Sequence, residues 1–199
     1  SGLGYYSRAR NLHKTAKIIM EELNGTLPHT IEDLLELPGI GKSTAGAILA
    51  LGYEIKAPIL DANVKRVLAR FKAIEGNLKK SRLNNELWLI AESMLPKKEI
   101  STYTQAIMDL GATVCTQKKP DCTICPVNLN CLAKEKGLIK EIPKKNIKKR
   151  TPIKKVFWLI AKNDKNEFFL KKRSDKGIWS GLWSFPEFST ISEVEKTKR

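Results

Sequence analysis

The chain has 199 residues, and its 36 Lys and Arg against 21 Asp and Glu give a formal charge of +15. This length corresponds to one or two domains, and 42% hydrophobic residues exclude a chain that is disordered throughout. Uncharged apolar runs such as 45–51 are far shorter than the ~20 residues that span a bilayer, and no secretory signal opens the chain.

We therefore expect a soluble intracellular protein, cytoplasmic and associated with DNA, because the simplest partner for such a positive excess is nucleic acid. The alternative is a solvated basic surface that binds no nucleic acid. The chain begins at Ser1 without an initiator Met and stops inside a segment with helical character, 191–199. Both ends are therefore expected to be cuts through a longer protein.

The first 135 residues show apolar residues at helical spacing, interrupted by Gly and Pro. Six helices are predicted in this part, and no alternation typical of strands occurs there, so we expect a mainly α domain. The predicted helices are Ser7–Leu23, Ile31–Leu37, Ser43–Gly52, Ala62–Phe71, Leu83–Met94 and Thr102–Cys115.

A Gly-x-Gly turn joins the second and third predicted helices in the segment Leu37–Ala45. The glycines Gly39 and Gly41 permit positive φ angles and close approach of another backbone. The N-terminus of the helix that follows offers free N–H groups to an anion such as a DNA phosphate. The alternative is an ordinary helical turn.

A single carboxylate, Asp61, stands directly before the fourth predicted helix. Its simplest role is an N-cap that accepts a hydrogen bond from the first turn. The same carboxylate could also stabilise a cationic, oxocarbenium-like sugar during cleavage of an N-glycosidic bond. The two roles are compatible.

All four cysteines fall within 17 residues with the spacing C-x6-C-x2-C-x5-C. This crowding favours metal ligands over structural disulfides, and a [4Fe–4S] cluster is the preferred interpretation because one tight loop can supply its four thiolates. A zinc site or free thiols remain alternatives, although zinc modules usually pair two C-x2-C knuckles. Four lysines flank the ligands and are expected to face a phosphate backbone. The ligands are Cys115, Cys122, Cys125 and Cys131, and the lysines are Lys118, Lys119, Lys134 and Lys136.

The composition changes twice beyond residue 135. Residues 136–153 carry many Lys and Arg and two prolines, which is typical of a basic linker. Residues 154–199 open with β-type runs at 155–162 and 167–172 around a predicted hairpin turn at 163–166. We expect the start of a second, α/β domain there.

Taken together, these motifs resemble those of the helix-hairpin-helix DNA glycosylases that carry an iron–sulfur cluster. The segments 2–12 and 60–67 are similar to the MutY-type adenine glycosylases, although Gly is commoner in the family at the position of Ala62. Residues 177–188 resemble the start of the Nudix-like domain that recognises 8-oxoguanine in these enzymes. The resemblance covers nearly the whole chain.

This resemblance implies a role for individual residues. Asp61 would be the carboxylate beside the sugar, Asn63 would orient it or the substrate, and Tyr5 would wedge into the base stack. The expected DNA contacts are Pro38, Gly39, Gly41, Lys42 and Ser43 in the hairpin, with Lys65 and Arg66 on the next helix. Ser43 stands where the bifunctional lyases carry a lysine, so the resemblance implies a monofunctional glycosylase.

The activity implied is hydrolysis of the N-glycosidic bond of adenine mispaired with 8-oxoguanine or guanine in double-stranded DNA, by a monomeric enzyme. The family's catalytic glutamate precedes residue 1, so the chain by itself is expected to be inactive. Two rivals remain: an endonuclease III-like glycosylase and lyase, and a non-catalytic iron–sulfur module that binds DNA.

Overall fold

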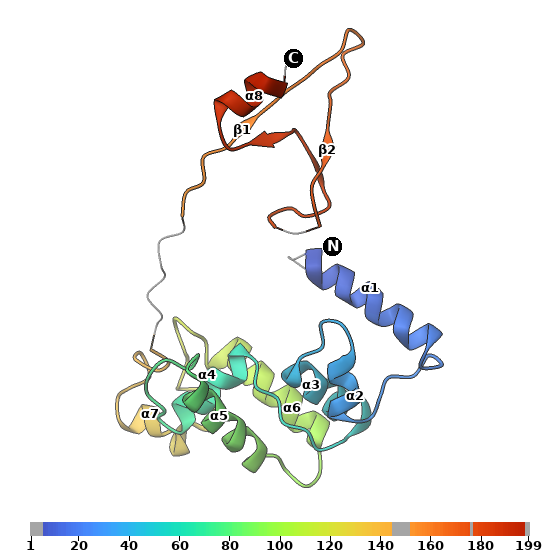
Figure 1. Cartoon of the computed structure of the whole chain (residues 1–199). Coiled ribbons are helices and arrows are strands. Elements are labelled where there is room, and N and C mark those ends of the chain that lie inside the picture. The colour runs from blue at the N-terminus through green and yellow to red at the C-terminus, as the bar shows by residue number, and fades with distance from the viewer. Residues whose placement is uncertain (1–5, 145–151, 176, 198–199) are drawn as a thin grey trace. The chain divides into compact units, whose positions relative to one another are not determined.

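The computed structural model describes residues 6–144, 152–175 and 177–197 (Figure 1). The chain divides into two compact units, Ser1–Ile147 and Lys148–Arg199. In the described ranges, no helix has the length and apolar character needed to cross a membrane.

The first unit is helical, and each of the six predicted helices is present. Helix α4 has both bounds as predicted, and most other bounds differ by one or two residues. The last predicted helix differs more, since it starts at Ile100 and its α-helical part ends at Asp109. That last helix also widens into a π-helical turn, η1, before the first cysteine. The elements are α1 (Tyr6–Glu21), α2 (Ile31–Glu36), α3 (Lys42–Tyr53), α4 (Ala62–Phe71), α5 (Ser81–Ser93), α6 (Ile100–Asp109), η1 (Leu110–Val114), η2 (Asn128–Asn130) and α7 (Leu132–Glu135).

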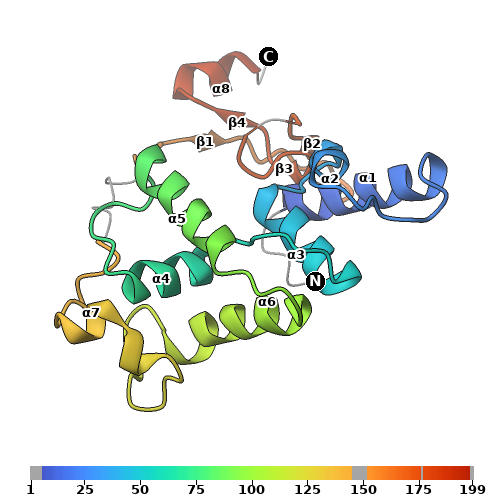
Figure 2. The same ribbon diagram turned by 90° about the horizontal axis from the view of Figure 1, so that it is seen from below.

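Helix α4 forms the centre of the larger of two apolar clusters, with α5, α6, η1 and α7 around it (Figure 2). Its face formed by Val64, Val67 and Leu68 is buried, at the 3–4 residue spacing of an amphipathic helix. A smaller cluster lies between α2 and α3, where Leu34 and Leu49 are buried. The fixed position of α4 matters because Asp61 lies at its N-terminus.

Helix α1 packs against the turn between α2 and α3. The Thr15 hydroxyl donates to the Pro38 carbonyl at 2.9 Å. Gly39 has a φ of +84°, and a Cβ on it would lie 2.8 Å from the Cβ of Asn11. The turn therefore requires glycine both for its backbone angle and for the close approach of α1.

A carboxylate from the end of α3 caps the N-terminus of α6. Glu54 accepts hydrogen bonds from the backbone N–H of Ile100 at 3.0 Å and of Ser101 at 3.3 Å. Carboxylate oxygens at a helix N-terminus accept hydrogen bonds from its free amides, and their negative charge interacts favourably with the helix dipole. This contact ties α6 to α3 across 46 residues of sequence.

Residues just beyond 135, which composition assigned to a linker, pack onto the first unit. Ile142 is only 1% exposed, and its carbonyl accepts a hydrogen bond from Arg70. The reason is the apolar residues Leu138, Ile139 and Ile142 between the lysines, which join the larger cluster. The prediction of a linker was based on the charged residues and did not consider these apolar ones.

The second unit contains two short antiparallel pairings. β1 (Phe157–Trp158) pairs with β4 (Glu187–Phe188), and β2 (Lys171–Lys172) pairs with β3 (Trp183–Ser184). The predicted turn at 163–166 is present, closed by a hydrogen bond from Asn163 N–H to the Glu167 carbonyl at 3.0 Å. Helix α8 (Ile191–Thr197) packs on β1 and β4.

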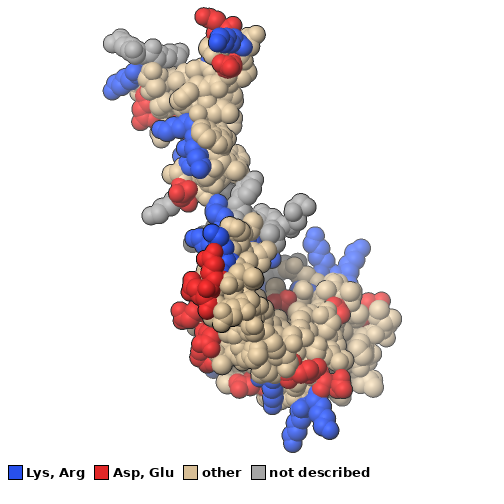
Figure 3. All heavy atoms as spheres, turned by 90° about the vertical axis from the view of Figure 1, so that its right-hand side faces the viewer, with Lys and Arg blue, Asp and Glu red and all other residues tan. Residues whose placement is uncertain are grey.

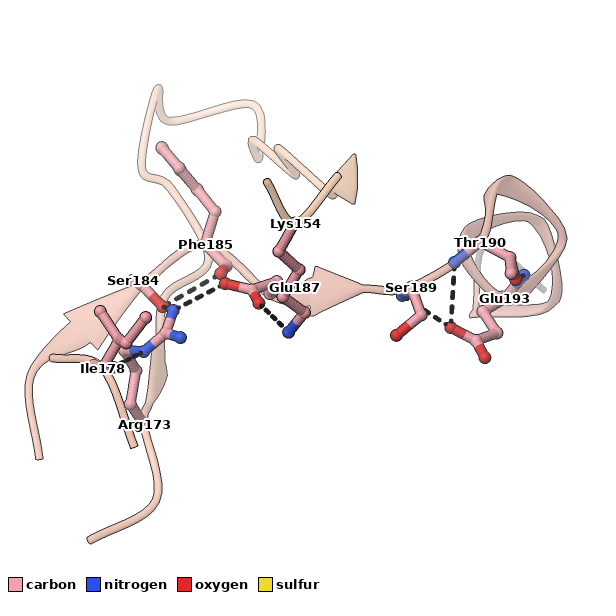
Figure 4. A network of polar contacts seen from close by, with 9 residues as sticks. All are labelled: Lys154, Arg173, Ile178, Ser184, Phe185, Glu187, Ser189, Thr190 and Glu193. Carbon is pink, nitrogen blue, oxygen red and sulfur yellow. Dashed lines mark hydrogen bonds and ion pairs between the residues drawn. The ribbon is translucent and has the colours of Figure 1, made fainter. Parts of the chain in front are cut away.

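Glu187 on β4 joins three segments of the second unit, as Figure 4 shows. Its carboxylate contacts Arg173 Nη1 at 3.0 Å and Lys154 Nζ at 3.2 Å. The hydrogen bonds from Arg173 and then from Lys154 hold the pKa of Glu187 below its ordinary value. The ionised form is therefore favoured in the folded state.

A lowered carboxyl pKa gives a pH-dependent contribution to stability. The contribution is complete above the unfolded pKa of about 4.3 and disappears as the pH falls through the lowered folded value. We expect the urea midpoint of the second unit, followed by its NMR signals, to fall less between about pH 4.5 and 2.5 in Glu187→Gln than in the parent. Lys165→Met removes an exposed lysine outside this network and should behave like the parent. An equal acid sensitivity of Glu187→Gln and the parent would contradict the prediction.

Candidate functional site

The hairpin turn presents backbone amides and one lysine to solvent. Ile40 N–H donates to the Leu37 carbonyl at 3.1 Å, which closes the turn, and α3 then begins with Gly41 as its N-cap. In the described part of the chain, no side chain caps this helix. Gly39, Gly41 and Lys42 are exposed, so the first-turn amides are open to an anion.

Helix α3 lies directly against the segment that leads to Asp61. The Ser43 hydroxyl accepts a hydrogen bond from Leu60 N–H at 3.0 Å. One turn further along α3, a Cβ on Gly46 would fall on the carbonyl oxygen of Pro58. These two contacts fix the distance between the hairpin helix and the carboxylate.

The close approach at Gly46 predicts a large effect of a single methyl group. Gly46→Ala is expected to destabilise the first unit by about 3 kcal/mol, because the added Cβ meets backbone atoms that cannot rotate away. Gly52→Ala on the same helix is the matched control, since nothing lies within 4 Å of its added Cβ. It is expected to leave stability unchanged or to raise it by up to about 1 kcal/mol. Urea unfolding of both variants measures the difference, and equal midpoints would contradict this account of the contact.

Asp61 occupies the N-cap position of α4, as the sequence predicted. Its Oδ1 accepts a hydrogen bond from Val64 N–H at 2.7 Å, and the residue is half-buried. The cap fixes the side chain relative to α4. The carboxylate is thus held in one place at the helix end instead of moving with a loop.

Arg66 connects the start of α4 with the beginning of the cysteine loop. Its Nη2 donates to Asn63 Oδ1 at 2.9 Å and to the Gly111 carbonyl, and its Nε donates to the Cys115 carbonyl at 2.7 Å. Burial lowers the pKa of this guanidinium; the charges of Cys115 and Asp61 oppose the shift, and the Arg70 charge adds to it. Arg66 was predicted as a DNA contact, whereas these donors bind within the protein and hold the Asn63 side chain.

The four cysteines line one pocket, together with side chains of α4 and η1. Burial raises the pKa of Cys122, and the charges of the other three cysteines raise it further, so the thiols are near one another. A metal or cluster that binds here must displace their protons. Among the described residues, no three His, Cys, Asp or Glu side chains are close enough to share one ion.

Arg70 is a site residue that the sequence analysis missed. It is only 2% exposed, and it donates to the Ile142 carbonyl at 2.8 Å and the Thr116 carbonyl at 2.7 Å. Its Nη1 also lies 3.3 Å from the Cys115 Sγ, and its own carbonyl accepts from Cys131 Sγ at 3.6 Å. The only signal in the sequence is its place on the otherwise apolar face of α4.

Local side-chain bonds shape the loop between the cysteines. Asp121 accepts from Thr123 N–H at 3.1 Å, forming a turn around Cys122. Asn128 donates to the Cys125 carbonyl at 2.8 Å and accepts from Lys134 at 3.1 Å. These bonds order the loop independently of any bound group.

The predicted site residues fall into groups that the structure places differently. It brings Ser43 next to the Asp61 segment, and Asn63 next to Arg66 and the cysteine loop. Lys65 is half-buried on α4, and the lysines around the cysteines are exposed. Tyr5 lies outside the described residues.

Comparison with known proteins assigns the class of this fold. The family model described as "HhH-GPD superfamily base excision DNA repair protein" matches residues 1–93. Residues 1–93 therefore belong to this superfamily of helix-hairpin-helix DNA glycosylases. This confirms the family resemblance and the mainly helical fold expected from the sequence.

The relatives within this superfamily are more specific. The chain is 44% identical over 194 residues to the adenine DNA glycosylase of Buchnera aphidicola from Acyrthosiphon pisum, covering 98% of this chain and 55% of that protein. It is 34% identical over 212 residues to the adenine DNA glycosylase of Arabidopsis thaliana, covering 100% of this chain and 34% of that protein. The chain thus spans about half or less of the length of these relatives.

Two similar solved structures are of proteins whose names or complexes refer to DNA. A thermostable thymine-DNA glycosylase is similar with a TM-score of 0.56 and 32% identity, covering 65% of this chain and 59% of that chain. An endonuclease III in a non-covalent DNA complex is similar with a TM-score of 0.52 and 27% identity, covering 66% of this chain and 60% of that chain.

Proposed function

We propose that the protein is a base-excision repair enzyme that hydrolyses the N-glycosidic bond of adenine mispaired with 8-oxoguanine or guanine. The observation that carries this proposal is the fixed placement of Asp61. It caps α4, and its segment is held against the hairpin helix by the bond between Ser43 and Leu60. The names of the relatives support adenine as the base released.

In this mechanism Asp61 faces the sugar and stabilises the positive charge that develops as the bond to adenine breaks. Asn63 orients the substrate, and Arg66 holds the Asn63 side chain by its bond to Oδ1. The adenine must leave the base stack to be reached. A general acid protonates the adenine as it leaves, and water completes the hydrolysis.

The enzyme is monofunctional in this proposal. A lyase needs an amine that forms a Schiff base with the sugar. Ser43, beside the Asp61 segment, has a hydroxyl group there and no amine. Borohydride trapping on substrate DNA tests this directly, and a covalent adduct would instead favour the endonuclease III-like rival.

The cysteine loop is proposed to hold a [4Fe–4S] cluster through Cys115, Cys122, Cys125 and Cys131. The donor set fits this group, because four thiols line one pocket and in such a cluster each thiolate binds its own iron. When bound, the cluster supplies a cross-link between the four points of the loop. Arg70, through its bonds to the carbonyls of Cys115 and Thr116, holds the start of the loop.

DNA is bound, in this proposal, by the hairpin residues Pro38, Gly39, Gly41, Lys42 and Ser43, by Lys65, and by the lysines of the cysteine loop. Phosphate contacts of this kind do not depend on base sequence. The charge on the surface is mixed, since Figure 3 shows Asp and Glu as well as Lys and Arg side chains on one face. The protein acts inside the cell as a monomer, and Tyr5 and the second unit would contribute recognition of the mispair.

Single-turnover release of adenine from a duplex with an adenine:8-oxoguanine pair tests the proposal. The 199-residue chain, reconstituted with iron, is compared with a form extended upstream. Release only by the extended form supports the proposal and places the acid upstream. Release by the shorter chain would require another acid, and release by neither form would favour the DNA-binding module.

A further inference from the structure

One contact at the hairpin joins two elements far apart in sequence. Lys42 is the first residue of α3, and its Nζ lies 4.3 Å from the centroid of the Trp88 ring on α5. Lys42 is exposed, whereas Trp88 is half-buried and packs against the apolar cluster around α4. The ring is therefore a fixed surface on which the lysine head rests.

The geometry is that of a cation–π interaction, which is strongest with tryptophan and typically changes an equilibrium about two- to five-fold at an exposed site. The ring occupies one side of the ammonium group. The remaining N–H donors of the exposed lysine point away from the ring and stay free for an acceptor. The contact with Trp88 therefore limits the motion of the Lys42 side chain and leaves its N–H donors available.

The position of Lys42 suits it to bind a phosphate. Lys42 stands at the open N-terminus of α3, next to the exposed amides of the Gly39–Gly41 turn. A lysine side chain has high rotational entropy, and a phosphate that binds a free lysine must pay for ordering it. A lysine ordered beforehand avoids that loss. A second lysine–aromatic pair among the described residues of the first unit, Lys72 over Phe71, joins sequence neighbours and lies away from the hairpin.

We propose that Trp88 is a positioning residue for DNA binding, which holds the Lys42 ammonium group beside the hairpin amides so that both meet one backbone phosphate. This inference rests on the proposed function, because it assumes that the hairpin binds DNA. It adds a residue of α5, outside the hairpin, to the phosphate site.

A double-mutant cycle on the 199-residue chain tests the inference, with duplex affinity measured by fluorescence anisotropy at several salt concentrations. Lys42→Met is expected to weaken binding about five- to tenfold. It should also reduce the steepness of log K against log salt by about one, the change that corresponds to one lost phosphate contact. Trp88→Met keeps the charge but removes the ring. It is expected to weaken binding about two- to fivefold with an unchanged slope. Trp88→Phe should lie between Trp88→Met and the parent.

The double variant decides the matter. If Trp88 acts through Lys42, Lys42→Met/Trp88→Met binds no more weakly than Lys42→Met alone. Additive losses, or tighter binding by Trp88→Met, overturn the inference while leaving the proposed function intact. An unchanged affinity of Lys42→Met would instead remove Lys42 from the phosphate site. Should Trp88→Met fail to fold, the cycle with Trp88→Phe gives the same comparison, and Lys72→Met is the matched lysine control.

Discussion

Replacing Asp61 with asparagine is expected to slow base release strongly and leave the fold intact. Asparagine is as good an N-cap as aspartate, so its side-chain oxygen can keep the bond to Val64 N–H. The negative charge that stabilises the cationic sugar is lost. A loss of about 10²- to 10³-fold in the single-turnover rate is expected by analogy with the removal of one electrostatic stabiliser from other active sites.

The comparison with Asp61→Ala separates the two roles of this residue. Alanine removes both the cap and the charge, so it is expected to cost about 1 kcal/mol of stability in addition to the rate. Urea unfolding and adenine release, measured in the form extended upstream, report the two effects independently. If Asp61→Asn released adenine within about threefold of the parent rate, Asp61 would be a cap only. Another group would then have to stabilise the cationic sugar.

The features that sequence could predict are those encoded within a few residues of each other. Apolar spacing located the helices of the first unit, and the glycines of the hairpin marked a turn that the Gly39 φ angle now explains. Asp61 was predicted as a cap from its place before a helix. The short cysteine spacing predicted a shared site, and the four cysteines line one pocket.

The features that sequence could not predict depend on partners distant along the chain. The place of Arg70 on the apolar face of α4 is a weak signal of burial, and it does not show that the side chain turns to the cysteine loop. The acceptors of Arg70 are backbone carbonyls 46 and 72 residues away, and every residue has a carbonyl. The Glu54 cap on α6 likewise requires the packing of α3 on α6. Only the assembled fold shows them.

The same distinction applies to the region after residue 135. The high lysine content of residues 136–144 predicts a linker. Whether the segment is buried depends instead on how its few apolar residues pack against the first unit. Ile142 fits against α4 because Arg70 satisfies its carbonyl in the interior. A buried arginine and a segment rich in lysine thus stabilise each other, and neither can be predicted without the other.

Arg70 is therefore expected to have the largest effect on stability of any residue in the site. Arg70→Met keeps much of the side-chain volume but leaves the carbonyls of Ile142 and Thr116 without their donor. Because each buried polar group left unpaired costs about 1–3 kcal/mol, the variant is expected to lose at least about 3 kcal/mol in the iron-free form. Urea unfolding of the iron-free chain measures this loss.

The cysteine loop should respond to the same change through its ability to bind iron. The Arg70 side chain contacts the Sγ of Cys115 and the Thr116 carbonyl beside it, so it orders the start of the loop, whereas the bond from Cys131 to the Arg70 backbone carbonyl is retained in Arg70→Met. Iron bound per chain after reconstitution is expected to fall in Arg70→Met and to stay at the parent level in Lys72→Met, whose lysine is exposed. Normal iron content with reduced stability would mean that Arg70 supports α4 and Ile142 only. Normal values of both would show that the buried guanidinium can be replaced by packing alone, as is known for some buried ion pairs.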